Sequence, residues 1–411
     1  MMVPTAVAGE GADMRVRVGV MALATAPLLA LGAGASAQAS TVRGDATVHT
    51  GGAGSLAVQP AATGVKPRIW GSNSFGELGD GNTTNRFTIG PVSVVTNAVE
   101  VAGGREHVIA LAADGTVWAW GSNQYGQIGD GTATNRPTPQ KVAGLTGVTM
   151  VATGHYSSMA LLSNGTVMDW GMNTFGQLGD GTKTKRSRPV AVHNLTNVVE
   201  IAGGRGHSLA LRSDGTVWAW GNNQFGELGD GTLTTRTLPV QVHNLSGVVA
   251  IAGGRDHSLA LKSDGTVWAF GNNVYGQLGD NTVTNRSLPV RVGTLTGVVA
   301  IAAGAYQSVA LKSDGTVWAW GRNNLGQVGD GTKTARHVPV QVHNLSGVVQ
   351  IACGRDHGAA VLSDGTVRTW GDNEYGQLGD GTTTTRLLPV TVPGATGVTS
   401  VTAGRSYTAV L

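Results

Sequence analysis

The sequence repeats itself with a period of fifty residues. An aromatic residue followed by glycine recurs at this interval, at Trp70, Trp120, Trp170, Trp220, Phe270, Trp320 and Trp370. Each one precedes a stretch of the form G-x-N-x-x-G-[QE]-x-G-D, as in 221–230. Such a period is typical of chains built from stacked supersecondary units. At 411 residues the chain exceeds the ~250–300 residues of one ordinary core, so many small cores are expected instead.

Each repeat divides into four predicted strands, here named a, b, c and d. In one unit they cover Val248 to Ala252, His257 to Lys262, Thr266 to Phe270 and Leu288 to Val292. Apolar residues alternate with a period of two, which indicates strands and not helices. An Asp-Gly turn joins b to c as a hairpin, because glycine adopts positive φ. A Gly/Asn-rich loop of roughly fifteen residues joins c to d, unusually long for a structureless connection, so we expect it to be ordered.

The two ends of the repeat array predict a closed ring. The array opens with a strand c at 68–70 and closes with a strand b at 406–411, so the terminal strands complete one shared blade. Four strands per unit repeated radially are the signature of a propeller, and closure leaves no exposed sheet edge. We therefore predict an all-β, seven-bladed β-propeller of four-stranded blades over residues 66–411.

The N-terminal 37 residues are predicted to be a signal peptide. Arg15 and Arg17 precede an apolar run at 18–33, and Ala35-Ser36-Ala37 provides a small-residue cleavage site. The run is shorter than the ~20 residues of a membrane span. We expect cleavage after Ala37, with either Met1 or Met14 as the start, and a protein that is secreted or held in the cell envelope. Residues 38–65 are rich in Ala, Gly, Ser and Thr, which predicts a flexible linker.

Composition and residue spacing argue against several function classes. The 28 basic and 25 acidic residues form no basic run, which disfavours a nucleic-acid partner. The one cysteine, Cys353, allows no internal disulfide and stands where other repeats carry small residues. No Ser-His-Asp or paired-carboxylate arrangement distinguishes any blade. We expect no enzymatic activity, no cofactor, no metal site, no membrane span after signal cleavage, and a monomer.

Residues present in every repeat are predicted to build the blade. Asn73, Asp80 and Arg86 each have counterparts in all seven units, so we expect an Asn-stabilised turn and an Asp–Arg contact that hold the c–d loop. A histidine opens strand b in four units, at His107, His207, His257 and His357. One residue per blade is too widely spaced for a shared metal ion, so we expect each histidine to bond a loop backbone.

Function is expected where the repeats differ, at the turns between strands a and b. Strand alternation puts these turns and the c–d loops on one face of the ring. Variable loops on a rigid scaffold often carry recognition, and Arg and Tyr are enriched at binding hot spots. A solvated rim without function is the alternative. The candidate binding residues are Arg105, Glu106, His107, His155, Tyr156, Arg205, His207, Arg255, Asp256, His257, Tyr306, Arg355, Asp356, His357, Arg405 and Tyr407.

The recurring motifs A-x-G-x-x-H-S-x-A-L, D-G-x-V-x-x-W-G and N-x-x-G-Q-L-G-D-G resemble the regulator of chromosome condensation repeat family over 68–411. With its export signal, the chain resembles a secreted bacterial member. The resemblance implies a seven-bladed propeller with a shared closing blade, and guanine-nucleotide exchange on the small GTPase Ran together with chromatin binding. The founding member uses an inserted wedge and a basic N-terminal tail, and this chain has neither.

Three function hypotheses follow. The leading one is an exported, non-enzymatic binding or scaffold propeller that recognises a protein or glycan through the a–b turn and c–d loop face. The alternative from the resemblance is a guanine-nucleotide exchange factor for a small GTPase. The third is an enzyme acting on a polymer such as a polysaccharide, for which the sequence offers no catalytic constellation.

Overall fold

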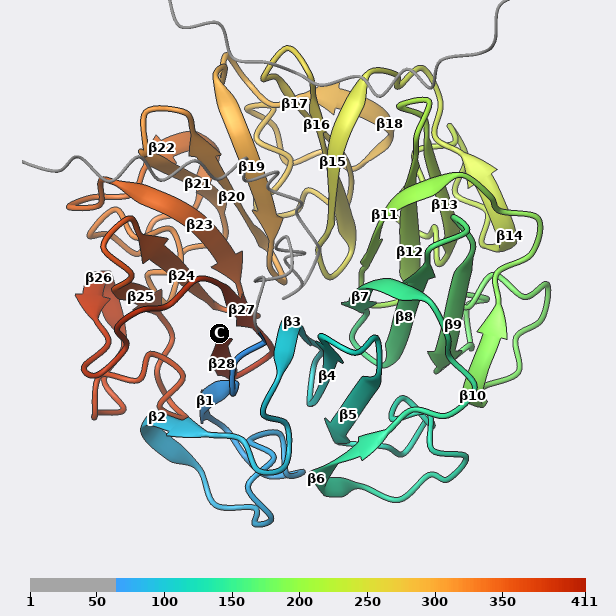
Figure 1. The fold of residues 1–411 in the computed structure, drawn as a ribbon. Helices are drawn as coiled ribbons and strands as arrows, with labels where there is room; N and C mark the ends of the chain where they lie inside the picture. Colours follow the sequence, from blue (N-terminus) through green and yellow to red (C-terminus); the bar gives the residue numbers. More distant parts are fainter. Residues whose placement is uncertain (1–63) are drawn as a thin grey trace, which may run out of the picture. The chain divides into compact units, whose positions relative to one another are not determined.

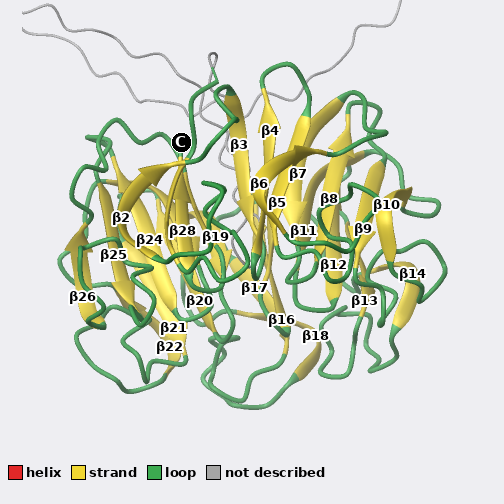
Figure 2. Cartoon of the chain, turned by 90° about the horizontal axis from the view of Figure 1, so that it is seen from below, coloured by secondary structure: helices red, strands yellow, loops and turns green. Residues whose placement is uncertain are grey.

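The computed structural model describes residues 64–411, which form twenty-eight β-strands (Figures 1 and 2). The predicted signal peptide and all but the end of the predicted linker lie outside these residues. No helix in the described range could span a membrane. The strands are β1 (Arg68–Gly71), β2 (Arg86–Pro91), β3 (Ala98–Gly103), β4 (His107–Ala112), β5 (Val117–Gly121), β6 (Arg136–Lys141), β7 (Val148–Thr153), β8 (Ser157–Leu162), β9 (Val167–Gly171), β10 (Arg186–Ala191), β11 (Val198–Gly203), β12 (His207–Arg212), β13 (Val217–Gly221), β14 (Arg236–Gln241), β15 (Val248–Gly253), β16 (His257–Lys262), β17 (Val267–Gly271), β18 (Arg286–Arg291), β19 (Val298–Ala303), β20 (Gln307–Lys312), β21 (Val317–Gly321), β22 (Arg336–Gln341), β23 (Val348–Cys353), β24 (His357–Leu362), β25 (Val367–Gly371), β26 (Arg386–Thr391), β27 (Val401–Ala403) and β28 (Tyr407–Val410).

The strands pair into seven antiparallel sheets of four, arranged as blades of a ring (Figure 1). Six blades use consecutive strands in the order a–b–c–d, as in β15-β16-β17-β18. The innermost strands a of neighbouring blades contact one another around the axis. The seventh sheet has the order β2-β1-β28-β27, so both ends of the propeller share it. The predicted all-β, seven-bladed propeller with a shared closing blade is confirmed.

Strand boundaries differ from the prediction by one or two residues. Strand d begins at Arg286 instead of Leu288, and strand c ends at Gly271. A register shift between Ala269 and Gly271 takes Phe270 out of pairing with strand d, so its ring packs into the core. Every c–d loop has the same length, as between β17 and β18 at 272–285. The loops are therefore as uniform as the blades.

The closing blade joins strands from opposite ends of the propeller. Arg68 of β1 pairs with Val410 of β28, and Trp70 pairs with Thr408. Upstream of β1, Val65 exchanges backbone hydrogen bonds of 2.9 Å with Ala98 of the next blade. The last residue assigned to the linker by sequence is thus paired with β3.

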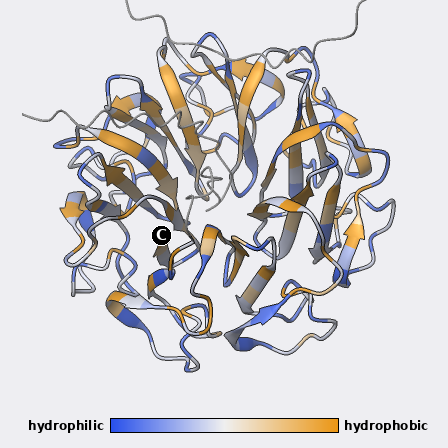
Figure 3. Cartoon of the chain, viewed as in Figure 1, coloured by the Kyte–Doolittle hydropathy of each residue, from blue (hydrophilic) through white to orange (hydrophobic). Residues whose placement is uncertain are grey.

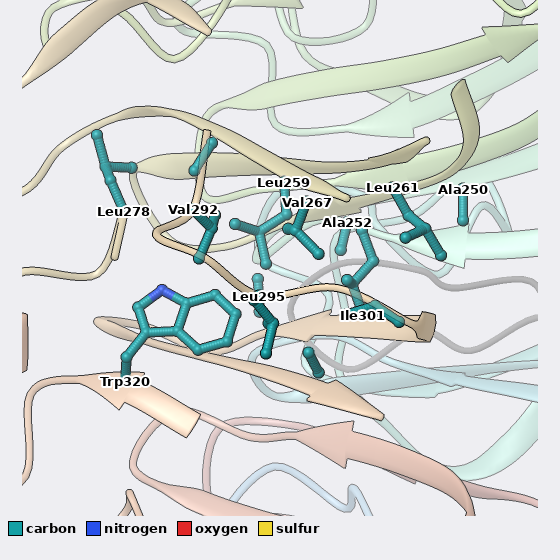
Figure 4. Packing of buried hydrophobic residues seen from close by; sticks show 14 residues of the cluster. Ala250, Ala252, Leu259, Leu261, Val267, Leu278, Val292, Leu295, Ile301 and Trp320 are labelled. Carbon is teal, nitrogen blue, oxygen red and sulfur yellow. The ribbon is translucent and has the colours of Figure 1, made fainter. Parts of the chain in front are cut away.

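Each pair of blades encloses its own hydrophobic core (Figure 4). Between the blades of β15–β18 and β19–β22, Leu259, Ile301 and Trp320 are fully buried together. The Trp320 indole also donates a 2.9 Å hydrogen bond to the Gln277 carbonyl of the preceding blade. The other five repeat tryptophans do the same, while Phe270 has no donor for it. Figure 3 shows the apolar strands and the more polar loops around them.

The repeated polar residues hold the c–d loops as predicted. The Asn223 amide donates to Asp230 at 3.1 Å and to the Thr232 carbonyl at 3.1 Å, and its oxygen accepts from the Leu228 amide. Asp230 pairs with Arg236 at 2.9 Å. The corresponding Asp–Arg pair forms in all seven blades, which confirms a structural role for these residues.

Candidate functional site

The a–b turns of all seven blades meet around the axis of the ring. Each turn contains a glycine followed by one residue that we call the axial residue. Backbone amides of these residues donate to carbonyls in the next blade's turn, and the seven bonds close a circle of 3.0–3.3 Å contacts. Because the circle uses only main-chain atoms, it leaves the axial side chains free to vary. The axial residues are Arg105, His155, Arg205, Arg255, Ala305, Arg355 and Arg405.

A cavity of about 480 Å³ lies inside this circle of turns. Four glycines of the a–b turns line it, namely Gly104, Gly304, Gly354 and Gly404. One wall comes from the β9–β10 loop and places Met172, Thr174 and Phe175 beside the turns. The cavity therefore combines a–b turns with a c–d loop, as predicted for this face. Seven candidate residues line it, namely Arg105, His155, Tyr156, Arg205, Arg255, Arg355 and Arg405.

Five arginines face this cavity, and none of the described residues that line it carries a carboxylate. The acidic candidates lie behind the guanidinium groups. Glu106 contacts Arg405 at 2.7 Å and Arg105 at 3.3 Å. Asp256 contacts Arg255 at 3.3 Å and Arg205 at 3.8 Å.

Asp356 contacts Arg355 at 3.1 Å, and Arg322 of the β21–β22 loop approaches it from outside at 3.7 Å. Asp256 and Asp356 are only 5% and 4% exposed, so they are not the accessible recognition groups that the sequence indicated. They position arginines, whose own side chains remain 30–40% exposed.

His155 is the one titratable axial residue that is not an arginine. Desolvation holds the pKa of its imidazole well below the usual value, and the positive charges of Arg105, Arg255 and Arg205 lower it further. The His155 imidazole is therefore uncharged at neutral pH, since protonation would add a positive charge among three arginines. It stands 6.4 Å from the Tyr156 ring, centroid to centroid.

The four strand-b histidines do not reach the cavity, and the predicted bond to a loop backbone is wrong. Each Nε2 lies 3.0 Å from a hydroxyl on the next blade, as between His257 and Ser308. That serine then donates to the Gln277 carbonyl at 2.8 Å. All four rings are buried, and desolvation lowers their pKa to about 4, or about 3 for His257. The residues concerned are His107, His207, His257 and His357.

Tyr407 fills the corresponding position in the closing blade and is also buried. Its hydroxyl donates to the carbonyls of His107 at 2.6 Å and Gly104 at 3.1 Å. It therefore joins the closing blade to the next one and is not presented at the surface. Cys353 is buried in β23, where desolvation raises the pKa of its thiol.

Tyr306 belongs to a second feature of the same face, outside the cavity. Its ring meets Tyr275 edge to face at 5.1 Å, and the Arg322 guanidinium lies 5.7 Å from its centroid. Arg255 lies 5.0 Å from the same ring. We call Tyr275, Tyr306 and Arg322 the rim cluster. Tyr125, Tyr156 and Arg105 form a similar group three blades away, with rings 5.1 Å apart and a cation–ring distance of 5.0 Å.

Sequence reasoning missed the contributions of the c–d loops, namely Met172, Thr174, Phe175, Tyr275 and Arg322. A signal was present. The first loop position changes from blade to blade, through Ser72, Ser122, Met172, Asn222, Asn272, Arg322 and Asp372. Such variation within a uniform loop marks a position that does not build the blade, although Ser122, Asn222 and Asn272 are buried there.

Comparison with known protein families shows which family this propeller matches. A model of the RCC1-like domain matches residues 186–411, and models of the regulator of chromosome condensation (RCC1) repeat match 69–111, 114–161 and 98–127. The chain belongs to the RCC1 repeat family. The match to an RCC1-like domain covers over half of this RCC1-repeat protein, and the repeat models cover most of the remaining blades.

Solved structures of other RCC1-type propellers agree in fold. Prp20p of Saccharomyces cerevisiae, described with binding properties to Gsp1p and histones, is 26% identical with a TM-score of 0.77. The match covers 86% of this chain and 92% of that one. Yeast RCC1 (Prp20) bound to Kap60 gives 26% and 0.79, covering 86% and 89%. Human WBSCR16 is 24% identical with a TM-score of 0.75, covers 85% and 98%, and supports the fold alone.

Proposed function

We propose that this RCC1-repeat protein is a non-enzymatic module that binds a partner protein through the a–b turn and c–d loop face. The observation that carries the proposal is where the blades differ. The tryptophans and the Asn, Asp and Arg of the loops are nearly uniform, whereas axial residues and first loop positions vary around one face. The relative Prp20p, described as binding Gsp1p and histones, supports a protein as the partner.

The rim cluster is the part of this face best suited to a protein contact. Tyr275 is 38% exposed, Tyr306 is half-buried, and Arg322 lies over both rings. Tyrosine and arginine supply large, partly preorganised contact surfaces and dominate measured hot spots. Each side chain is held by its neighbours, so little conformational entropy remains to be lost on binding.

Affinity capture with the purified chain tests this proposal. The variant Tyr275→Ala, Tyr306→Ala and Arg322→Ala should recover the captured partner at least tenfold less well. A matched control changes residues at the opposite end of the blades, as Val249→Ala, Val299→Ala and Lys262→Ala, of which the two valines are exposed and the lysine is partly exposed. Equal recovery by both folded variants would remove the rim cluster as the binding surface.

Guanine-nucleotide exchange is the second candidate, favoured by the match to Prp20p over 86% of the chain. Against it, all seven c–d loops have equal length, so none of these loops carries an inserted wedge. Release of labelled GDP from a Ran-type GTPase would decide the question. Acceleration by the chain supports exchange, and an unchanged release rate eliminates it.

We further propose that the protein acts outside the cytoplasm as a secreted or envelope protein. The basic residues, apolar run and Ala35-Ser36-Ala37 site support export. N-terminal sequencing of the protein recovered from cells should begin at Gln38. A mature protein that retains 1–37 would contradict the proposal. A glycan partner and a monomeric state remain predictions, checked by glycan-array binding and by light scattering.

A further inference from the structure

The axial cavity has the composition of a built anion site. The guanidinium groups of Arg105, Arg205, Arg255, Arg355 and Arg405 line it from five different blades, and no acidic side chain is among its lining residues. A guanidinium offers five N–H donors in a planar fork that suits carboxylate and phosphate oxygens. Five positive charges in one small cavity repel one another and cost free energy unless a counter-charge is present. The circle of a–b turns holds each arginine at the cavity.

The hydrogen bonding of these arginines is incomplete. Among the described residues, the guanidinium groups of Arg205, Arg255 and Arg355 donate no hydrogen bond, and their ion pairs are 3.1–3.8 Å long. The Nε atoms of Arg105 and Arg255 also lack a hydrogen-bond partner, but they are buried 3.3 Å from the carboxylates of Glu106 and Asp256. The guanidinium groups of Arg205, Arg255 and Arg355 therefore have N–H donors that a ligand in the cavity can engage.

The charge balance specifies the ligand more closely. Five guanidinium groups stand against the three carboxylates of Glu106, Asp256 and Asp356, which leaves two positive charges. Arg322 pairs with Asp356 from outside and does not reduce this excess. Burial raises the pKa of Glu77 and Glu227 behind the ring to about 7, so each is about half charged at neutral pH and together they offset the additional positive charge of Arg322. A dianion matches this excess better than a monocarboxylate.

The cavity is also asymmetric. Tyr156, Met172 and Phe175 stand on the side of one blade, while the arginines occupy the rest of the circle. Its volume of about 480 Å³ lies within the ~300–1,000 Å³ typical of small-molecule sites. A ligand that fits both sides has a dianionic head and a planar or apolar body.

We propose that the arginine-lined axial cavity binds a small phosphate monoester, with its phosphate among the arginines and its organic body against Phe175 and Met172. The site is distinct from the rim cluster, whose residues do not line the cavity, although Arg255 contacts the Tyr306 ring and Arg322 contacts Asp356 behind Arg355. Binding requires no covalent step. Charge-assisted N–H to O bonds from two or more guanidinium groups supply the affinity, and they weaken with added salt.

Calorimetric titration of the purified full-length chain at pH 7 tests this site, with phenyl phosphate as the probe. Inorganic phosphate supplies the dianion without a body, and benzoate supplies the ring with a single charge. We expect saturable one-to-one binding of phenyl phosphate, at least tenfold tighter than benzoate. Phe175→Ala should reduce the advantage of phenyl phosphate over inorganic phosphate. Benzoate binding as tightly as phenyl phosphate would overturn the dianion assignment.

The variant Arg205→Gln with Arg355→Gln should weaken phenyl phosphate binding at least tenfold. Arg212→Gln is the matched control, because Arg212 pairs with Asp214 at 3.6 Å at the opposite end of the blades. The proposal fails if wild-type protein shows no saturable binding, or if the double variant binds within twofold of the control. It also fails if an acidic peptide binds through these arginines while phenyl phosphate does not. Loss of the protein partner with phosphate binding intact would instead affect only the proposed function.

Discussion

The two ends of the propeller are built from the same repeats but tolerate variation very differently. At the end with the b–c turns, six hairpins carry Asp or Asn before glycine, and that side chain accepts hydrogen bonds from a threonine two residues later. At the other end, the axial residue is Arg in five blades, His in one and Ala in one.

The difference lies in which atoms make the structural bonds. At the b–c turns the Asp or Asn side chain completes the turn with its hydrogen bonds, so only these two residue types occur there. Around the axis, main-chain atoms alone close the circle, for example from the Arg255 amide to the Gly304 carbonyl at 3.1 Å. The axial side chains can therefore vary without disrupting the circle of turns. A recognition surface requires such variation.

The largest expected effect comes from the glycine beside a variable axial residue. A Cβ on Gly254 would overlap the Cε1 and Nδ1 atoms of the buried His257 ring and approach the Gly304 carbonyl oxygen at 2.9 Å. We expect Gly254→Ala to destabilise the protein by about 3 kcal/mol, as overpacking of a rigid site does. Chemical denaturation measures the change. A loss below 1 kcal/mol would show that the circle of turns is more adaptable than its bonding indicates.

Asp169 sharpens the comparison, because it is a variable residue placed inside a blade. Four counterparts are alanine, at Ala119, Ala219, Ala269 and Ala319, and one is Thr369. Asp169 is fully buried, and within residues 64–411 neither carboxyl oxygen has a hydrogen-bond partner. We expect Asp169→Ala to stabilise the protein by about 2 kcal/mol at neutral pH, the scale of an unsatisfied buried polar group.

The gain should depend on pH. Desolvation raises the pKa of Asp169 in the folded protein well above the unfolded value near 4, so folding takes up a proton. The penalty grows as pH rises from about 4 toward the folded pKa, and it shrinks as pH falls. Unfolding curves of both proteins at pH 4 and pH 7 should show the smaller difference at pH 4. An equal gain at both values would mean that Asp169 is ionised in the fold.

A glycine at the uniform end should be less sensitive. Gly265 has a φ of +75°, and a Cβ there would come no closer than 3.1 Å to the Gly297 amide nitrogen. We expect Gly265→Ala to destabilise by about 1–2 kcal/mol, the penalty of a left-handed backbone for a residue with a side chain. Thermal unfolding against Gly254→Ala tests the order. A larger effect for Gly265→Ala would reverse it.

The fifty-residue period predicted most of the fold. The residues common to all repeats make their contacts within one blade or with the equivalent position of the next blade. The sequence shows that Asn223, Asp230 and Arg236 recur together. Their contacts lie within one loop, so residues close in sequence are enough to predict them. The sequence does not show that His257 bonds Ser308, since that contact crosses to the next blade. The circle of main-chain hydrogen bonds leaves no residue pattern in the sequence. The sequence could therefore identify the arginines of the a–b turns, but not the cavity that they line or the burial of Asp256.

The smallest expected effect concerns Arg205, an axial residue at the variable end. Its guanidinium lies 3.8 Å from Asp256, which keeps a second partner in Arg255 at 3.3 Å. Because the pair is long, Arg205 is 35% exposed and the buried Asp256 retains Arg255, Arg205→Ala should change the free energy of unfolding by less than about 0.5 kcal/mol. The same variant should bind phenyl phosphate measurably more weakly. Weaker binding without a stability loss would show that the axial arginines serve recognition, whereas a loss above 1 kcal/mol would place Arg205 among the residues that build the ring.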